Sequence, residues 1–140
     1  NVRTFLDHNR IWENPKYNTE NRVSESTGAF AHRGVSIRTN QVEDNLLEHL
    51  QKWSPYVSKF GLLLIELHTI PPAIAARNIG KTAATAYDAT HGFSDQYIVE
   101  IDVFNKVAAE AGLYPDPAVF RKFPDSEIAT VSINLLKGKD

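Results

Sequence analysis

The first side chains in the sequence that could do chemistry follow a short apolar run at residues 2–6. They are Asp7, His8 and Asn9. An imidazole titrates near neutral pH, and a neighbouring carboxylate can adapt it to act as a general base. Neighbouring residues in a strand point to opposite faces, so Asp7 can orient His8 only if the chain turns there. Two roles are open for His8: a catalytic base or a structural hydrogen bond.

A second pair of polar side chains, Glu66 and His68, ends a longer apolar run at residues 60–67. Their i, i+2 spacing lets both side chains project to the same side of a strand. In an open α/β sheet, ligands bind outside the carboxyl ends of the strands. We therefore expect this pair to share one sheet edge with the polar residues 7–9.

Residues 87–96 hold the densest group of possible ligands: two carboxylates, a histidine, an amide and hydroxyls. A divalent metal needs imidazole and carboxylate ligands with open positions beside them. His91 with Asp95 or Gln96 could supply such ligands, helped by the pair at the end of the second apolar run. The alternative is a helix cap at Ser94 or Asp95 beside a surface histidine.

Side chains elsewhere give weaker indications of function. Trp12 either walls a pocket or packs on the core. His32 with Arg33 and Arg38 could hold an anion, and solvated surface charges are the alternative. We predict His49 on the exposed face of a helix. The sequence contains no Gly-rich dinucleotide or phosphate loop, no nucleophile elbow and no zinc-protease motif.

The composition is that of one soluble globular domain spanning residues 1–140. Of the 140 residues, 42% are hydrophobic and 23% are charged, and the net charge is -2. This near balance excludes a general binder of nucleic acid or anionic membranes, so we predict neither partner. No apolar stretch is long enough to cross a bilayer, and there is no signal-peptide core. The absence of cysteine excludes disulfides and thiolate metal sites, and we predict a cytoplasmic protein.

Hydrophobic periodicity predicts an α/β order of elements. Helical spacing predicts a helix at about 40–53, and the Ser-Pro step of 54–55 either ends it or begins a short second turn. The continuous run at 60–67 predicts a central parallel strand covered on both faces. Residues 94–112 predict one long helix, or a strand at 97–101 before a shorter helix. The remaining predictions are a strand at 2–6, a long loop at 13–34, a short helix at 72–77, an irregular segment at 83–92, and a closing hairpin of 119–123 with 128–136.

These elements and one run of residues resemble a known family. The run Thr-His-Gly-Phe-Ser-Asp-Gln at residues 90–96 is its most specific part. With the strands before it and the hairpin after it, this run resembles the C-terminal half of a class I S-adenosylmethionine-dependent methyltransferase. The likeness is to the methyltransferase domains embedded in some polyketide synthases, and it covers nearly the whole chain. It implies half of a Rossmann-like sheet of about four strands, mixed and ending in an antiparallel hairpin, with helices on its faces.

The resemblance also implies an activity and a site. The activity would be C-methylation of a small-molecule or acyl-carrier-linked polyketide substrate, and some members of that group use bound iron or manganese. His91 and Gln96 would be metal ligands, with Asp95 as a weaker one. His8 and Tyr87 would be catalytic residues facing the substrate. Glu66 and His68 would lie at the edge of the pocket. With Asp7 and Asn9 at the neighbouring strand end and Trp12 in the first loop, they are the predicted substrate-binding residues.

The part of the family that binds S-adenosylmethionine lies upstream of the part that this chain resembles. Because the chain also starts without an initiator methionine, we expect a truncated domain whose activity depends on a missing donor-binding half. Its first strand would then be an open apolar edge, which we expect a homodimer contact or a partner segment to cover. The alternatives are a stand-alone small-molecule or metal-binding protein and an interaction module without catalytic activity.

Overall fold

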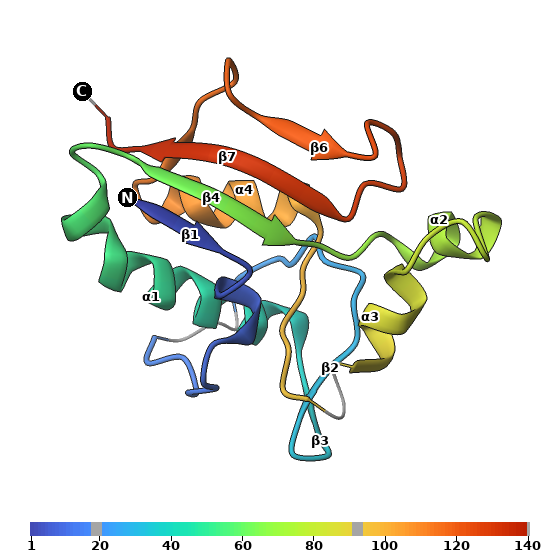
Figure 1. Cartoon of the computed structure of the whole chain (residues 1–140). Helices are drawn as coiled ribbons and strands as arrows, with labels where there is room; N and C mark the ends of the chain where they lie inside the picture. Colours follow the sequence, from blue (N-terminus) through green and yellow to red (C-terminus); the bar gives the residue numbers. More distant parts are fainter. Residues whose placement is uncertain (18–20, 91–93, 140) are drawn as a thin grey trace.

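The computed structural model describes residues 1–17, 21–90 and 94–139, in which helices and strands alternate around one sheet (Figure 1). In chain order the elements are β1 (Val2–Thr4), the 3-10 turn η1 (Asp7–Asn9), β2 (Phe30–His32), β3 (Val35–Ile37), α1 (Thr39–Val57), β4 (Leu62–Leu67), α2 (Pro72–Arg77), α3 (Ala84–Thr90), α4 (Ile101–Glu110), β5 (Tyr114–Pro115), β6 (Arg121–Phe123) and β7 (Val131–Lys137). No helix in these described ranges combines the length and the apolar character that crossing a bilayer requires.

The main sheet has five strands in the order β1-β4-β7-β5, and β6 also pairs with β7. β1 runs parallel to β4, whereas β7 is antiparallel to its three neighbours. The predicted interior position of β4 and the predicted closing hairpin, β6 with β7, are both confirmed. The mixed sheet confirms the predicted α/β class and is consistent with a partial Rossmann-like methyltransferase fold, with β5 as a strand that was not predicted.

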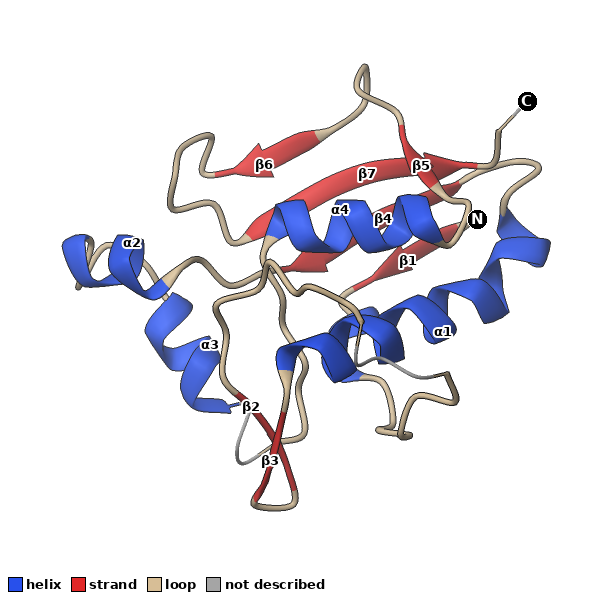
Figure 2. Cartoon of the chain, turned by 180° about the vertical axis from the view of Figure 1, so that it is seen from behind, coloured by secondary structure: helices blue, strands red, loops and turns tan. Residues whose placement is uncertain are grey.

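The two long helices, α1 and α4, lie on the same face of this sheet (Figure 2). Their apolar residues recur every three or four positions, which gives each helix one buried stripe. Full burial of a large aliphatic or aromatic side chain contributes about 1.5–3 kcal/mol, so this layer supplies much of the stability. The core between the helices and the sheet includes Val42, Leu46, Leu50, Leu62, Leu64, Val103, Phe104, Val107 and Leu136.

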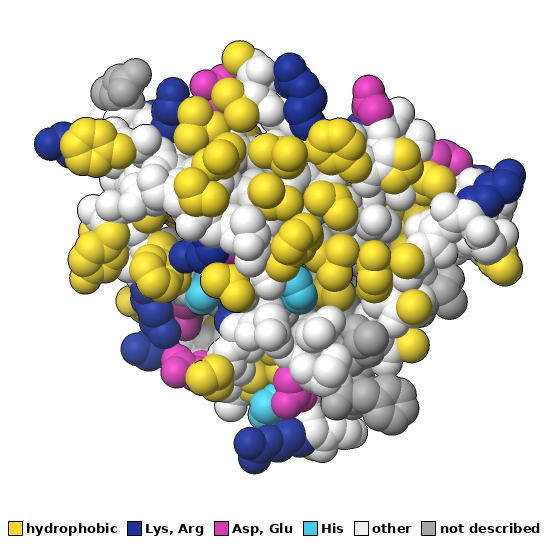
Figure 3. Space-filling view, viewed as in Figure 1, with side chains coloured by type: hydrophobic (Ala, Val, Ile, Leu, Met, Phe, Trp, Pro, Cys, Tyr) yellow, Lys and Arg dark blue, Asp and Glu magenta, His cyan; other side chains and the backbone are white. Residues whose placement is uncertain are grey.

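The opposite face of the sheet is only partly buried. Side chains alternate along β4 and β7 between fully and partly buried positions. Leu63, Ile65 and Ile133 belong to the partly buried set. Figure 3 shows hydrophobic side chains gathered across this face. β4 is therefore fully covered on one face only, and the prediction that both faces are covered is wrong.

Helix α1 extends beyond the predicted end. It passes through Pro55 and ends at Val57, after which the Ser58 amide donates to the Ser54 carbonyl. A proline restricts the residue before it, but here the buried Val57 fixes the last turn against the core. Gly61, with a φ of 87°, then turns the chain into β4.

The segment between β4 and α4 also departs from prediction. Residues Ala84–Thr90 form α3, where an irregular segment was predicted, because Ala84 is buried in a small core with Ile70 and Ala75. The long helix predicted from residue 94 is wrong, since α4 begins only at Ile101. The segment before α4 is extended, and its amides and carbonyls bond to η1 and to the end of β4. This arrangement is nearer to the alternative of an extended segment before a shorter helix.

Residues 13–34 are mostly loop, as predicted, but the loop ends in a small hairpin. β2 and β3 pair antiparallel through a turn in which Arg33 and Gly34 have positive φ. Phe30 and Ile37, the pair at the open end, are buried in the main core. These are the only two buried residues of the segment 30–37, and its apolar residues do not alternate clearly enough to predict the hairpin.

Candidate active site

The carboxyl end of β1 turns sharply and delivers two polar side chains into the molecule. Phe5 adopts a φ of 53°, and the next residues form the single 3-10 turn η1. Such a backbone costs a non-glycine residue about 1–2 kcal/mol, so the surrounding contacts must hold it. Asp7 and His8 are both buried as a result. The chain therefore turns at this point and brings both side chains into the interior, where each has a different partner.

His8 is paired with Glu66, which projects from β4 next to it. The two atoms His8 Nδ1 and Glu66 Oε1 lie 2.5 Å apart. The other oxygen of Glu66, Oε2, accepts the amides of Asp7 (3.0 Å) and His8 (3.2 Å), and Oε1 also accepts the amide of Leu67 (2.7 Å). Three amide donors therefore fix the orientation of this carboxylate.

This pairing sets the tautomer of His8. A carboxylate can only accept, so Nδ1 of the neutral imidazole carries the proton and Nε2 keeps its lone pair. Within the described residues, Nε2 of His8 makes no hydrogen bond. A carboxylate-oriented histidine with one unengaged nitrogen is the arrangement that a general base requires.

Asp7 is fully buried and faces away from this pair. Its carboxylate receives Arg3 through Nη2 (2.7 Å) and Nε (3.1 Å), and His49 through Nε2 (2.8 Å). Burial acts to raise the pKa of Asp7, but the hydrogen bonds and charges of His49 and Arg3 outweigh it, and the pKa is lowered. His49 is therefore a half-buried partner of Asp7, and the prediction that it lies exposed on a helix face is wrong.

Arg10 ties the turn to helix α1. Its guanidinium donates to Asn45 Oδ1 (2.5 Å) and to the carbonyls of Asp7 (2.9 Å) and Val42 (3.3 Å), and it lies 5.4 Å from the centre of the Tyr97 ring. Burial lowers the pKa of Arg10 to about 10, so it stays charged near neutral pH. Tyr97 in turn donates its amide to the carbonyl of His8 at 2.7 Å.

His68 is placed in the core and not at a solvent-facing edge. Its Nδ1 lies 3.1 Å from the Val99 carbonyl, and its Nε2 lies 2.6 Å from Ser132 Oγ. Burial lowers the pKa of His68 to about 3, so the ring is neutral at ordinary pH. Both ring nitrogens are engaged, which favours a structural role.

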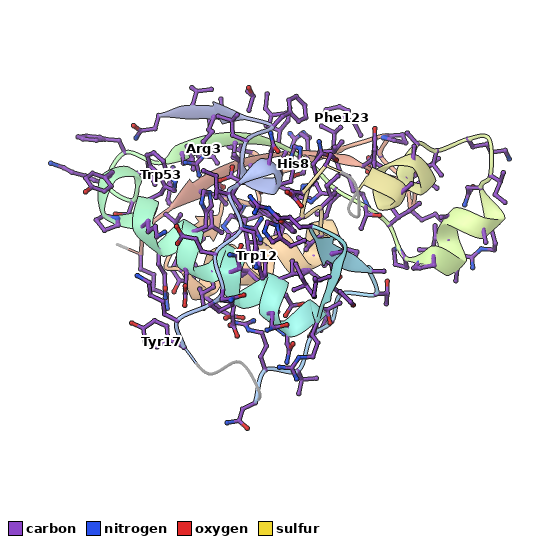
Figure 4. The ribbon with its side chains drawn as sticks, turned by 90° about the horizontal axis from the view of Figure 1, so that it is seen from below. Arg3, His8, Trp12, Tyr17, Trp53 and Phe123 are labelled. Atoms are coloured by element: carbon purple, nitrogen blue, oxygen red, sulfur yellow. The ribbon has the colours of Figure 1, made fainter. Side chains whose placement is uncertain are left out.

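The other predicted residues are spread around this centre. Trp12 packs on Tyr97, with ring centres 5.1 Å apart, and Figure 4 shows it beneath η1 and His8. Asn9 ends η1 and lines a surface pocket of about 330 Å³ that includes Arg10 and His49. Tyr87 is half-buried on α3, a different element from those that carry the His8–Glu66 pair.

The predicted metal ligands are only partly described. His91 lies outside the described residues. Asp95 Oδ1 lies 3.3 Å from His32 Nδ1 and accepts the Arg33 amide at 3.4 Å, and Gln96 is partly buried. In the described ranges, no three His, Asp or Glu side chains are grouped as a metal site.

Sequence reasoning missed three residues of the network: Arg3, Arg10 and Asn45. Arg10 closes the polar run that begins at Asp7, so its position in that run was a usable signal. Asn45 sits between two apolar positions of the α1 stripe, where a buried amide indicates a fixed partner. Arg3 gave no signal, because an arginine on a short edge strand is ordinary.

The chain matches a methyltransferase family model described as the AprA MT2-like domain, over residues 1–134. The chain belongs to this family. The AprA MT2-like assignment agrees with the mixed sheet and with the resemblance to methyltransferase domains of polyketide synthases. Membership makes the chain a methyltransferase-like domain, and methyltransferases in general use S-adenosylmethionine. No curated protein matches the chain.

Proposed function

We propose that this AprA MT2-like domain carries the acid–base half of a C-methyltransferase, with His8 as the base. The observation that carries the proposal is the His8–Glu66 pair, which engages Nδ1 and leaves Nε2 of His8 without a hydrogen bond to the described residues. Methylation of an amine or a thiolate needs no strong base, because a lone pair is already present. A carbon acid or a hydroxyl must first lose a proton, so an oriented base fits either one, and the resemblance to methyltransferase domains of polyketide synthases favours carbon.

The substrate class that fits is an acyl thioester with an acidic carbon next to its carbonyl, either free or linked to an acyl carrier. Nε2 of His8 takes the proton from that carbon, and the C–H electron pair passes into an enolate. The positive charge that forms on His8 is stabilised by Glu66 at 2.5 Å. S-adenosylmethionine, when bound, supplies the methyl group to the carbon. The proton on His8 then passes to solvent, which regenerates the base.

The described residues of this chain fit the proton-transfer chemistry. The sequence contains no Gly-rich dinucleotide-type loop, so we assign no residue of this chain to the methyl donor. β1 pairs only with β4 among the described strands, and Val2 is 71% exposed on this edge. An open apolar edge is a site for strand association. We propose that a second copy or a donor-binding segment covers it.

The metal site and the cellular location predicted from the sequence are also proposals. Iron or manganese would be held around His91, Asp95 and Gln96, and no step above depends on it. Elemental analysis of the purified chain, compared with a variant that carries both His91→Ala and Gln96→Ala, tests this proposal: equal metal content in both would contradict it. The cytoplasmic location also stays a prediction from the sequence.

Exchange of the α-proton tests the proposed base without any methyl donor. A 3-oxoacyl thioester of N-acetylcysteamine in D2O should exchange its α-proton faster with the chain than with buffer alone. His8→Ala should lose roughly 10²–10⁴-fold of that rate. Added imidazole should restore part of it, because it can occupy the space left by the ring. Exchange that is unchanged in His8→Ala would overturn the proposal.

A further inference from the structure

Asp7 is a buried charge that joins three elements. Its side chain is 0% exposed, and its carboxylate binds Arg3 from β1 and His49 from α1. Figure 4 shows Arg3 beside Trp53, and the guanidinium carbon lies 4.7 Å from the centre of that indole ring. Arg3 is thereby held in place on two sides. The carboxylate of Asp7 is therefore fixed by groups that belong to the sheet and to the long helix.

The backbone of Asp7 acts on the catalytic pair directly. Its amide donates to Glu66 Oε2 at 3.0 Å, and its carbonyl accepts Arg10 Nη1 at 2.9 Å. Asp7 thus contacts Glu66 through its amide and precedes His8 in the same turn. Any rotation of Asp7 would move both members of the pair.

The turn that carries His8 has little stability of its own. η1 is three residues long, has no side-chain cap at its start, and closes with one backbone bond of 3.3 Å from the Asn9 amide to the Leu6 carbonyl. A single 3-10 turn is too short to persist without outside contacts. The contacts of the Asp7 carboxylate tie this turn to β1 and α1, beside the bonds that Arg10 makes to α1 and Glu66 makes to the amides of η1.

We propose that Asp7, held by Arg3 and His49, is a positioning residue that fixes His8 in the tautomer with a free Nε2. This inference rests on the proposed role of His8 as the base. Asp7 touches no reacting atom in this scheme. It acts by keeping Nδ1 of His8 against Glu66, so loss of its charge should loosen that contact. His8 should then sample both tautomers.

The test compares Asp7→Asn and His49→Gln with the parent chain. The matched control is Asp44→Asn, because Asp44 is also an ion-paired and largely buried carboxylate. Asp44 lies on α1 but binds Arg22, not η1. Nitrogen NMR of the His8 ring should show one tautomer in the parent and in Asp44→Asn, and a mixture in the other two variants. α-Proton exchange should fall about 10- to 100-fold in those two, mainly in kcat.

The outcomes separate this inference from the proposed function. If His8→Ala keeps full exchange, the base is misassigned and the proposed function fails. If His8→Ala loses exchange while folded Asp7→Asn keeps the parent's rate and tautomer, the positioning role alone is wrong. Should Asp7→Asn fail to fold, His49→Gln decides, since it keeps the Arg3–Asp7 contact. A parent-like tautomer and rate in His49→Gln would then overturn the inference.

Discussion

Replacing Glu66 by glutamine should invert the tautomer of His8 and remove its function as a base. The substitution keeps size and shape but turns one carboxylate oxygen into an NH2 donor. Oε2 faces the amides of Asp7 and His8, and Oε1 faces the Leu67 amide and His8 Nδ1. Backbone donors cannot reverse their direction, whereas an imidazole can change tautomer.

The donors around this side chain determine which way the new amide should be oriented. Its oxygen should face the two amides of η1, because the opposite orientation would set a donor against both of them. Its NH2 then faces His8 Nδ1, which must become an acceptor, so the proton moves to Nε2. The NH2 group also opposes the Leu67 amide, and one unmet donor of this kind costs about 1–3 kcal/mol.

The predicted loss of α-proton exchange in Glu66→Gln is roughly 10²–10⁴-fold, the usual contribution of a positioned base. Nitrogen NMR should place the His8 ring proton on Nε2, and the free energy of unfolding should fall by about 1–3 kcal/mol. The control is Glu127→Gln, since Glu127 is 56% exposed and pairs with Arg77 on α2. An exchange rate within a few-fold of the parent, in a folded Glu66→Gln variant, would refute the reasoning.

Three further predictions concern stability and assembly. The pKa of Asp7 is lowered below its ordinary value of 3.8 in the folded chain. Its contribution to stability should therefore be present above about pH 4 and lost as the pH falls through its folded pKa, so denaturant unfolding of Asp7→Asn should lack this loss. Burial lowers the pKa of His68 from 6.5 to about 3. Stability tied to the neutral ring should be complete above pH 6.5 and decline as the pH falls toward 3, and His68→Gln should show a shallower decline over that range. Sedimentation should show a homodimer of the isolated chain that Val2→Lys converts to monomer, because lysine on an edge strand opposes pairing; a monomeric parent at high concentration would contradict the dimer.

Much of the sheet could be predicted from local patterns. The continuous run of β4 and the two apolar segments around residues 124–126 identified the interior strand and the closing hairpin, since strand period and turn residues are local properties. Local patterns could not predict the conformation of the segment 94–100. Its apolar residues suit both a helical stripe and a buried extended segment, and bonds to η1 and β4 decided between them.

The sequence predicted where the candidate site lies but not which side chains are hydrogen-bonded to each other in it. Asp7, His8 and Glu66 were expected at one sheet edge, and the parallel pairing of β1 with β4 brings them together there. The sequence left open whether Asp7 orients His8, because this role required the chain to turn there. The chain does turn, at Phe5, but the Asp7 carboxylate then bonds to His49, and His8 pairs with Glu66, which is 58 positions away in the sequence.

The sequence by itself determined the α/β class, the absence of thiol chemistry, the methyltransferase resemblance and the edge where chemistry would gather. These follow from composition, periodicity and short motifs, which neighbouring residues carry. Only the tertiary structure decided which carboxylate orients His8, that Arg10 and His49 support the turn, and that His68 is sealed in the core. The physical reason is that a buried side chain takes its partner from whichever donor or acceptor the packed elements place within hydrogen-bond distance, and sequence separation has no part in that choice.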